Sequence, residues 1–296
     1  TRDAILTAWE AAQMWFDWER HLGTVDPDGM ARFVECGNLI LRTTGYDGTA
    51  ITPWWDEFDI PYEDLDAAAL RQRFPVLDVG KYYPPKLIDD PAFADEAIGE
   101  LTALYSPNCG FIDDPMLSAK NLAYAARQHG AEFRFRSEVV SINQADNAVS
   151  GVTLASGESL TAPVVVNVGG PHSSIINTMA GVTDDMTIGH RALRQEVFTA
   201  HAPVGLRLED GAPFVSDLDV GQYFRPQIGG TLLIGGSEPE CDELHWIDDP
   251  DTNSEYPTVE VWETAMMRVA RRVPEFGVPS QPVGLAALYD ASDDWV

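Results

Sequence analysis

The sequence predicts an α/β fold in which two domains share the chain discontinuously, one around a covered, mostly parallel sheet and one on antiparallel strands. The first observation is the segment TAPVVVNVGGPHSS at residues 161–174. It contains a run of three valines at 164–166 and, shortly after it, the glycine pair Gly169-Gly170. A run that is apolar on both faces fits a buried strand of a parallel sheet. The second is a series of strand patterns after residue 190, with a glycine pair that fits a hairpin turn. The third is the alternation of helical and strand patterns without an internal repeat.

The N-terminal part predicts a helix, a strand pair and a second helix. Apolar residues near helical spacing predict an amphipathic helix over Ile5–Leu22. Two short runs, at 33–35 and 38–42, are interpreted as strands that pair with each other around Gly37. A helix over Leu65–Phe74 follows, and it must stop there because the next residue is a proline.

The middle of the chain predicts a helix, an antiparallel meander and the buried strand. Asp114-Pro115 starts a helix that ends at about Gly130, a residue type common just past a helix end. The buried strand at Val164–Val168 comes after the meander, and Pro171 presets the backbone for a helix behind it. The meander strands are expected at 139–142, 149–154 and 159–162, with turn residues between them.

Strands dominate the last third of the sequence. A helix is predicted over Thr258–Val273, closed by the proline that follows it, and a last short strand over Gly284–Tyr289. The other strands are expected at 190–201, 214–217, 222–225 and 231–234.

Composition excludes several classes of function. Among 296 residues, 47 Asp and Glu stand against 19 Lys and Arg, a net charge of −28, so nucleic acid and anionic membranes are unsuitable partners. No apolar run is long enough to span a bilayer, and the N-terminus has no signal-peptide pattern. Three widely separated cysteines favour a reducing, cytoplasmic compartment. The six histidines show no metal-ligand spacing, so we expect no metal site.

The turn that ends the buried strand is a candidate ligand site. Open α/β sheets bind ligands at the carboxyl ends of their strands. Gly169 and Gly170 would let a ligand approach the backbone, and the N–H groups of the next helical turn attract phosphate. The alternative is a core strand followed by an ordinary turn.

The order of several segments resembles the D-amino-acid-oxidase-like FAD-dependent oxidoreductase family, in particular its sarcosine, dimethylglycine and glycine oxidase and dehydrogenase branch. Each segment is weak alone, but their order and spacing are specific and span nearly the whole chain. They are GFIDDPML at 110–117, the helix end and strand from His129 to Ile142, VVVNVGGPHS at 164–173, QYFRP at 222–226 with GGTLLIG at 229–235, and GLAALYDASDD at 284–294.

The sequence departs from the family pattern in two places. Family members open with a strand and a GxGxxG turn that cradles the FAD pyrophosphate, and no GxGxxG occurs here. They close with a glycine-rich segment after a Thr-Pro-Asp turn, whereas this sequence stops at Val296. The chain therefore resembles an interior fragment with an incomplete Rossmann-like FAD-binding domain. We expect it to bind FAD weakly or not at all and to be inactive alone.

The resemblance implies oxidation of the carbon–nitrogen bond of a small amine or amino acid, of the sarcosine, dimethylglycine or glycine type, with FAD as cofactor. It implies that Val139 offers backbone groups to the adenine. Gly169, Gly170 and Pro171 would pass close to the ribityl chain or pyrophosphate, and His172 stands where the family usually has Trp. Oxygen or an electron-transfer partner would reoxidise the flavin. The alternative for His172 is a partly exposed residue at a helix start.

The resemblance also implies three catalytic-site residues. Tyr223 matches a tyrosine that the family places over the flavin, and Tyr289 precedes the Thr-Pro-Asp-like turn. Arg225 is two residues after Tyr223, hence on the same strand face, and could clamp a substrate carboxylate. The alternative for Arg225 is an ion pair with one of the many surface acids.

The resemblance further implies a FAD-binding domain and a second, substrate domain built on an antiparallel sheet. Two other functions stay open: a glycerol-3-phosphate-type FAD dehydrogenase, and a truncated, non-catalytic binding module, which the missing phosphate turn favours. The expected boundaries are 1–36, 107–179 and 280–296 for the FAD-binding domain, and 37–106 and 180–279 for the substrate domain.

Overall fold

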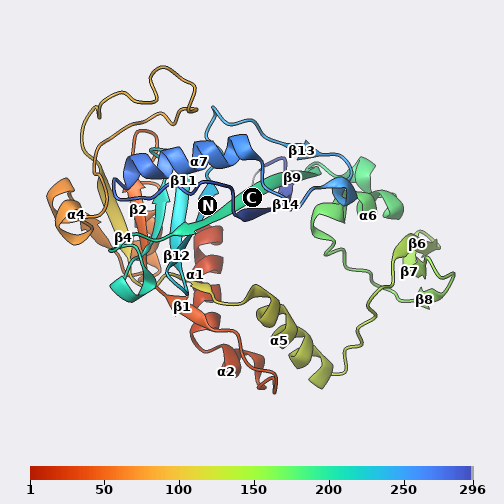
Figure 1. Ribbon diagram of the computed structural model, residues 1–296. Coiled ribbons are helices and arrows are strands. Elements are labelled where there is room, and N and C mark those ends of the chain that lie inside the picture. The colour runs from red at the N-terminus through yellow and green to blue at the C-terminus, as the bar shows by residue number, and fades with distance from the viewer. Residues whose placement is uncertain (295–296) are drawn as a thin grey trace. The chain divides into compact units, whose positions relative to one another are not determined.

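Two compact units make up the computed structural model, which describes residues 1–294 (Figure 1). Both units are discontinuous in sequence. Unit 1 consists of Thr1–Ala131, Glu196–Glu243 and Pro257–Leu285, and unit 2 of Glu132–Gln195, Leu244–Tyr256 and Ala286–Val296.

A mixed sheet has the strand order β13-β9-β12-β11-β10-β2-β4-β3, and β14 also pairs with β9. The pairing of β10 with β2 is parallel, whereas β9–β12, β12–β11, β11–β10 and β2–β4 are antiparallel. The predicted antiparallel sheet in the last third of the chain is thus confirmed. The bounds are β2 Asn38–Arg42, β3 Glu63–Leu65, β4 Thr102–Ser106, β9 His190–His201, β10 Phe214–Asp217, β11 Gln222–Gln227, β12 Thr231–Gly236, β13 Trp246–Ile247 and β14 Gly284–Ser292.

The predicted pairing of the strands at 33–35 and 38–42 with each other is wrong. The first of them, β1 (Phe33–Glu35), pairs with β5 (Gly110–Ile112), while β2 pairs with β4 and β10. Gly37 does not reverse the chain, because its N–H and that of Cys36 both donate to the carbonyl oxygen of Cys109. The chain therefore runs on from one sheet into the other.

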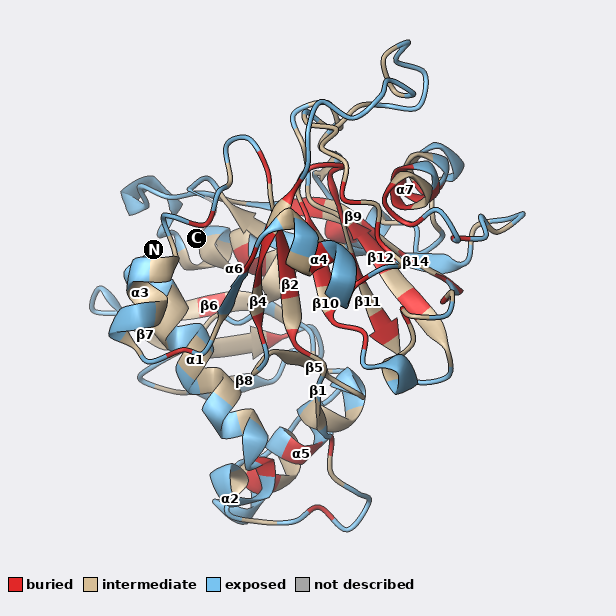
Figure 2. Cartoon of the chain, turned by 90° about the vertical axis from the view of Figure 1, so that its left-hand side faces the viewer, coloured by how far each residue is buried: buried red, intermediate tan, exposed pale blue. Residues whose placement is uncertain are grey.

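The main core lies between the sheet and two helices, α4 (Ala67–Arg73) and α7 (Val259–Arg272). Strand β11 alternates buried and half-buried residues, so one face turns to the core and the other stays open. Figure 2 shows buried residues along β2, β10 and β11. The fully buried side chains of this core include Leu39, Leu41, Phe198, Phe224, Leu232, Met266 and Val269.

The remaining helices largely follow the predicted pattern. The first predicted helix is split at Asp17, whose φ of −134° is not helical, into α1 (Arg2–Phe16) and α2 (Trp18–Leu22). Helix α5 (Pro115–Gln128) begins after Asp114, whose carboxylate accepts the N–H of Leu117. Helix α3 (Thr52–Glu57) was not predicted. None of the helices in the described chain has the length and apolar character needed to cross a membrane.

Asn121 ties α5 to the loop before β1, and we expect Asn121→Ala to lower the free energy of unfolding by about 1–3 kcal/mol. Its buried amide accepts the Ala31 N–H at 2.9 Å and donates to the Gly29 carbonyl at 2.8 Å and to Asp26 at 3.2 Å. Truncation leaves these groups without a partner. Urea unfolding measures the loss, and Gln128→Ala, an exposed change on the same helix, serves as control. Equal stability of the two variants would contradict the assignment.

Unit 2 contains the predicted antiparallel meander, formed by β6 (Val139–Ala145), β7 (Ala148–Leu154) and β8 (Ser159–Thr161). Helix α6 (Ser173–Ala180) follows the glycine turn through the short 3-10 helix η1 (Gly170–His172). The other 3-10 helices are η2 (Thr183–Asp185) and η4 (Pro250–Thr252) in unit 2, and η3 (Leu208–Asp210) in unit 1.

The predicted buried strand at Val164–Val168 is wrong for the described chain. This stretch has no assigned strand, and Val164, Val166 and Val168 are 70%, 73% and 87% exposed. A β-branched run favours an extended backbone, but burial requires a neighbouring strand to complete the hydrogen-bond ladder. No other described segment forms a ladder with these residues. The valine pattern alone therefore does not establish a buried strand.

A buried ionic cluster joins α7 to the sheet of unit 1. The Arg272 guanidinium, fully buried, donates to Asp217 at 2.6 Å and to Asp219 at 2.9 Å, both also fully buried. Its Nη1 group donates to the carbonyl oxygens of Asp78 and Gly80. The C-terminal end of α7, the turn after β10 and the segment from residue 78 are thereby held together.

Candidate functional site

The open face of β11 carries two of the predicted site residues. Tyr223 and Arg225 alternate with Gln222, Phe224 and Pro226, which are buried on the core side. The half-buried Tyr223 and Arg225 therefore project together from the opposite face. The structure thus brings together these two candidates within unit 1.

The Tyr223 ring is held between an aromatic neighbour and a glycine. It stacks on Phe214 of β10, with ring centroids 5.5 Å apart and an angle of 12° between the planes. Gly235 is its register partner on β12, and a Cβ at Gly235 would lie 2.3 Å from the Tyr223 hydroxyl oxygen. The ring can lie across β12 only because residue 235 has no side chain.

Arg225 is supported by an aromatic ring and not by an acid. Its guanidinium lies 4.0 Å from the ring centroid of Phe111, a residue of β5. No carboxylate of the described residues is within ion-pairing distance of it, in a chain with 47 acidic residues. Burial lowers the pKa of Arg225. The ion pair with a surface acid, which the sequence allowed, is therefore not formed among the described residues.

Phe111 and Phe214 were missed as functional residues by sequence reasoning. Each belongs to a short strand of three or four residues, and a phenylalanine in such a strand is read from the sequence as ordinary core. Phe111 stands inside the segment at 110–117 that resembles the family, which was the only available signal. Both act through stacking on residues more than a hundred positions away or on a neighbouring strand, so only the folded structure reveals them.

The predicted cofactor residues lie in unit 2. Val139 begins β6, and Gly169 precedes η1, in which Gly170, Pro171 and His172 follow in order. Gly170 has a φ of +55° and open space where a Cβ would point, so a ligand can approach its backbone there.

His172 is half exposed, and its Nε2 lies 3.0 Å from the Asp251 carboxylate. Tyr289 also lies in unit 2, on β14, where 56% of its surface is exposed. Its neighbour Asp290 is 3.4 Å from Nδ1 of His190. His172 and Asp251 are thus an exposed polar pair beside the proposed cofactor turn, whereas the side chains of His190 and Asp290 are largely covered.

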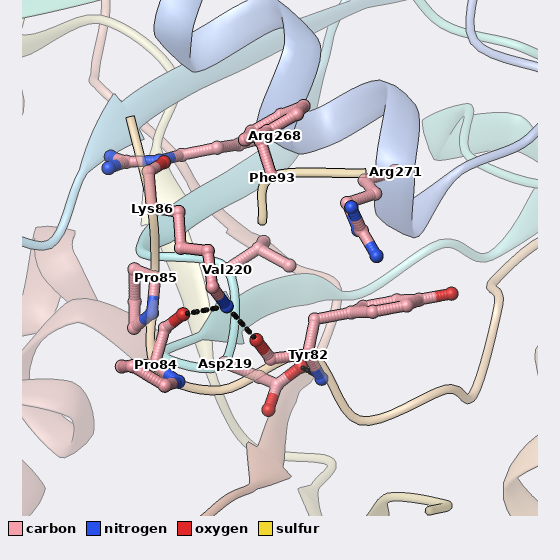
Figure 3. A pocket seen from close by; sticks show the side chains of 9 residues that line it. All are labelled: Tyr82, Pro84, Pro85, Lys86, Phe93, Asp219, Val220, Arg268 and Arg271. Carbon is pink, nitrogen blue, oxygen red and sulfur yellow. Dashed lines mark hydrogen bonds between the residues drawn. The ribbon is translucent and has the colours of Figure 1, made fainter. Parts of the chain in front are cut away.

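Two described cavities are lined by none of the predicted site residues. One, in unit 1, has a volume of about 20 Å³, the size of a single water molecule (Figure 3). Figure 3 shows the Lys86 ammonium pointing to the carbonyl oxygens of Tyr82 and Pro84, 3.3 and 3.1 Å away. This cavity of unit 1 is too small for an amine substrate. The other, in unit 2, has a volume of about 470 Å³ and is lined by Asp185, Met186, Thr187, Ile188, His190, Ser292 and Asp294.

Comparison with known proteins gives a consistent picture. The sequence profile described as "FAD dependent oxidoreductase" matches residues 4–294. L-proline dehydrogenase from P. horikoshii is similar in structure, with a TM-score of 0.70 and 17% identity over 96% of this chain and 66% of that one. Glycine oxidase from Geobacillus kaustophilus has a TM-score of 0.67 and 20% identity over 98% and 68%.

Iminodiacetate oxidase from Chelativorans sp. BNC1 is a third similar structure, with a TM-score of 0.65 and 15% identity over 98% of this chain and 69% of that one. At such identities the likeness concerns the fold. The chain spans about two thirds of the length of these solved structures. No curated protein matched the sequence.

Proposed function

Because this chain belongs to the FAD-dependent oxidoreductase family, we propose that it oxidises the carbon–nitrogen bond of a small amine or amino acid that carries a carboxylate. The observation that carries the proposal is Arg225, a cation on the half-buried face of β11 without an acidic partner among the described residues. In so acidic a protein such an arginine is best explained by an anionic ligand. Substrates of the sarcosine, dimethylglycine or glycine type fit this requirement.

In this proposal the residues of β11 bind and orient the substrate. The Arg225 guanidinium binds the carboxylate through two parallel N–H groups, and the Phe111 ring covers one of its faces and excludes water there. The Tyr223 hydroxyl, fixed by Phe214, hydrogen-bonds a polar group of the substrate. FAD, when bound, supplies the hydride acceptor.

We assign the cofactor contacts to unit 2 residues. Gly169, Gly170 and Pro171 would line the ribityl chain or pyrophosphate, where Gly170 leaves open space beside its backbone. Val139 would meet the adenine, and His172 and Tyr289 would lie near the flavin. The division into FAD-binding segments (1–36, 107–179, 280–296) and substrate segments (37–106, 180–279) is part of the same proposal.

We also propose that this chain binds FAD weakly. Its sequence has no GxGxxG turn, so the pyrophosphate would lack several charge-assisted backbone hydrogen bonds, each contributing roughly 1.5–3 kcal/mol. Titration with FAD, followed by flavin fluorescence, should give a saturable dissociation constant in the micromolar range. A submicromolar constant contradicts weak binding. The absence of a saturable signal would mean that this chain does not bind FAD, an outcome that the missing GxGxxG turn also allows, and would favour a non-catalytic binding module.

The substrate class is tested by steady-state kinetics of the natural FAD-loaded enzyme that contains this chain, with an artificial electron acceptor. Sarcosine, dimethylglycine and glycine should reduce the acceptor, whereas the matching amines without a carboxylate should be poor substrates. Turnover of glycerol 3-phosphate with none of the amines would instead support the glycerol-3-phosphate-type alternative. Whether oxygen or an electron-transfer partner accepts the electrons is read from peroxide formation in the same assay.

Gly235 is a positioning residue for Tyr223 in this proposal, and Gly235→Ala should lower kcat/KM by up to about tenfold. The new methyl group would force the Tyr223 ring off its rotamer, a displacement that costs about 0.5–1.5 kcal/mol. Gly236→Ala is the matched control, because a Cβ there meets no atom within 4 Å. Thermal midpoints of both variants distinguish a moved ring from unfolding. If both variants keep the original kcat/KM, the ring position is irrelevant to the reaction.

We also propose a cytoplasmic location and a small-molecule ligand for this protein. The three cysteines carry free thiols, which fits a reducing, cytoplasmic setting. The excess of acidic residues opposes binding to nucleic acid. We therefore propose a small carboxylate-bearing amine as the principal ligand besides FAD.

A further inference from the structure

Cys36 and Cys109 face each other at the end of the β1–β5 ladder. The last register pair of this ladder is Glu35 with Gly110, so the next residues in order are the two cysteines. The Cys36 N–H donates to the Cys109 carbonyl oxygen at 3.0 Å, and the Gly37 N–H donates to the same oxygen at 2.9 Å. The antiparallel pairing therefore continues to the cysteines, with Gly37 as one extra residue opposite Cys109.

This backbone arrangement suits a disulfide. Residues opposite each other on antiparallel strands have Cα atoms about 4.5–5.5 Å apart and side chains on the same face. A disulfide bridges Cα atoms that are about 4.4–6.8 Å apart. Cys36 and Cys109 are both free and half-buried, so neither is sealed in the core. The two strands need not separate or slide for their sulfur atoms to meet.

The cysteine pair is close to the residues that support the proposed substrate site. Phe111, which stacks on Arg225, is two residues after Cys109. The backbone N–H of Phe214, which stacks on Tyr223, donates to the carbonyl oxygen of Gly37, the residue after Cys36, at 2.9 Å. The positive charge of Arg225 also acts on Cys36. A covalent link between the cysteines would thus fix the strands that carry both aromatic supports.

We propose that Cys36 and Cys109 form a reversible disulfide by exchange with a small-molecule disulfide, as a redox-controlled modification beside Arg225. One cysteine thiolate attacks the small disulfide, forms a mixed disulfide and releases one small thiol. The second cysteine thiolate attacks the mixed disulfide and releases the other small thiol. The protein loses two protons and two electrons, and the small disulfide is reduced to two thiols. Burial raises the pKa of both thiols, so the exchange should be faster at alkaline pH.

The test is a thiol count on the whole chain after incubation with oxidised glutathione at about pH 8.5. Maleimide labelling after denaturation should find that two of the three thiols are lost, and dithiothreitol should restore them. Peptide mass spectrometry should find Cys36 linked to Cys109. In Cys241→Ser, the matched control, both remaining thiols should be lost. Three persistent thiols, a link through Cys241, or glutathione retained on single cysteines would each overturn the proposal.

Thermal stability provides a second readout. The disulfide would close a loop of about 70 residues, and the thermal midpoint should rise by at least about 5 °C on oxidation. Cys36→Ser should show no such rise, and Cys241→Ser should keep it. An equal rise in Cys36→Ser overturns the assignment. Neither readout needs FAD or an amine, so failure of this proposal is distinguishable from failure of the proposed function.

Discussion

Replacing Arg272 with methionine is expected to lower the free energy of unfolding by about 3–5 kcal/mol, the usual cost of breaking a buried ion pair by removing one partner. Arg272, Asp217 and Asp219 are all fully buried. Methionine fills much of the volume but leaves both carboxylates without their cation. The loss therefore comes from uncompensated buried charge and not from a cavity.

The effect should extend beyond the helix that carries Arg272. Asp219 also accepts the Thr43 hydroxyl at 2.6 Å and the backbone N–H groups of Tyr82 and Tyr83 at 2.7 and 3.1 Å. Arg272 additionally donates to the carbonyl oxygen of Gly80. Because these bonds share two carboxylates and one guanidinium, removing the guanidinium weakens the anchoring of the segment after residue 78 to the sheet.

Urea unfolding at two pH values tests this expectation. Burial raises the pKa of Asp217, and Arg272→Met removes the charge that opposes this rise. When the pKa of a carboxyl group is raised in the folded state, the folded protein loses stability as the pH rises through that pKa. The deficit of the variant relative to the parent protein should therefore shrink at acidic pH.

Arg71→Met is the control for Arg272→Met. Arg71 forms its ion pair with Glu100 at the surface, with both side chains about half exposed. Such pairs typically contribute about 0–1 kcal/mol. A deficit for Arg272→Met no larger than that of Arg71→Met would show that the buried cluster adds little to stability.

Replacing Arg225 with lysine is expected to weaken the apparent affinity for a carboxylate-bearing substrate by about tenfold to a few hundredfold, the range of one charge-assisted hydrogen bond. Lysine keeps the positive charge but loses the planar pair of N–H groups and the stacking on Phe111. The flavin content should not change, because the predicted cofactor residues lie on other segments. Arg20→Lys, on an exposed arginine, is the control.

Tyr223→Phe provides an independent test of the same face. Only a hydroxyl group is removed, so stacking on Phe214 and the thermal midpoint should be preserved while kcat/KM falls. Steady-state kinetics and the flavin spectrum are measured together for both variants. If Arg225→Lys and Tyr223→Phe both retain the original kcat/KM on the preferred substrate, β11 has a structural role only.

Strands with a clear alternation were predictable from the sequence. The strands at 190–201 and 214–217 agree with β9 and β10 to the residue, and the turn at Gly229-Gly230 joins β11 to β12 as expected. In β10 and in the second half of β9, buried residues alternate with less buried ones, so local pattern and tertiary environment agree there. The same alternation correctly placed Tyr223 and Arg225 on one face.

Features that depend on distant segments were not predictable. Strands β3 and β5 have only three residues each, too few to show a period. The exposed Val164–Val168 segment looks like a buried strand locally, because composition does not say whether a partner strand is present. The stacking of Arg225 on Phe111 joins positions more than a hundred residues apart, and no local pattern encodes it.

The parallel pairing of β2 with β10 has a consequence for biosynthesis. Asn38 pairs with Phe214, so the ribosome adds some 175 residues after β2 before the second neighbour of β2 has been synthesised. At about 5–20 residues per second, this interval lasts roughly 10–35 s. During translation β2 can pair with β4, but its other edge stays open to intermolecular contacts. Folding of this sheet is therefore completed late, and nascent chains should depend on chaperones that shield an exposed strand edge until β10 has emerged.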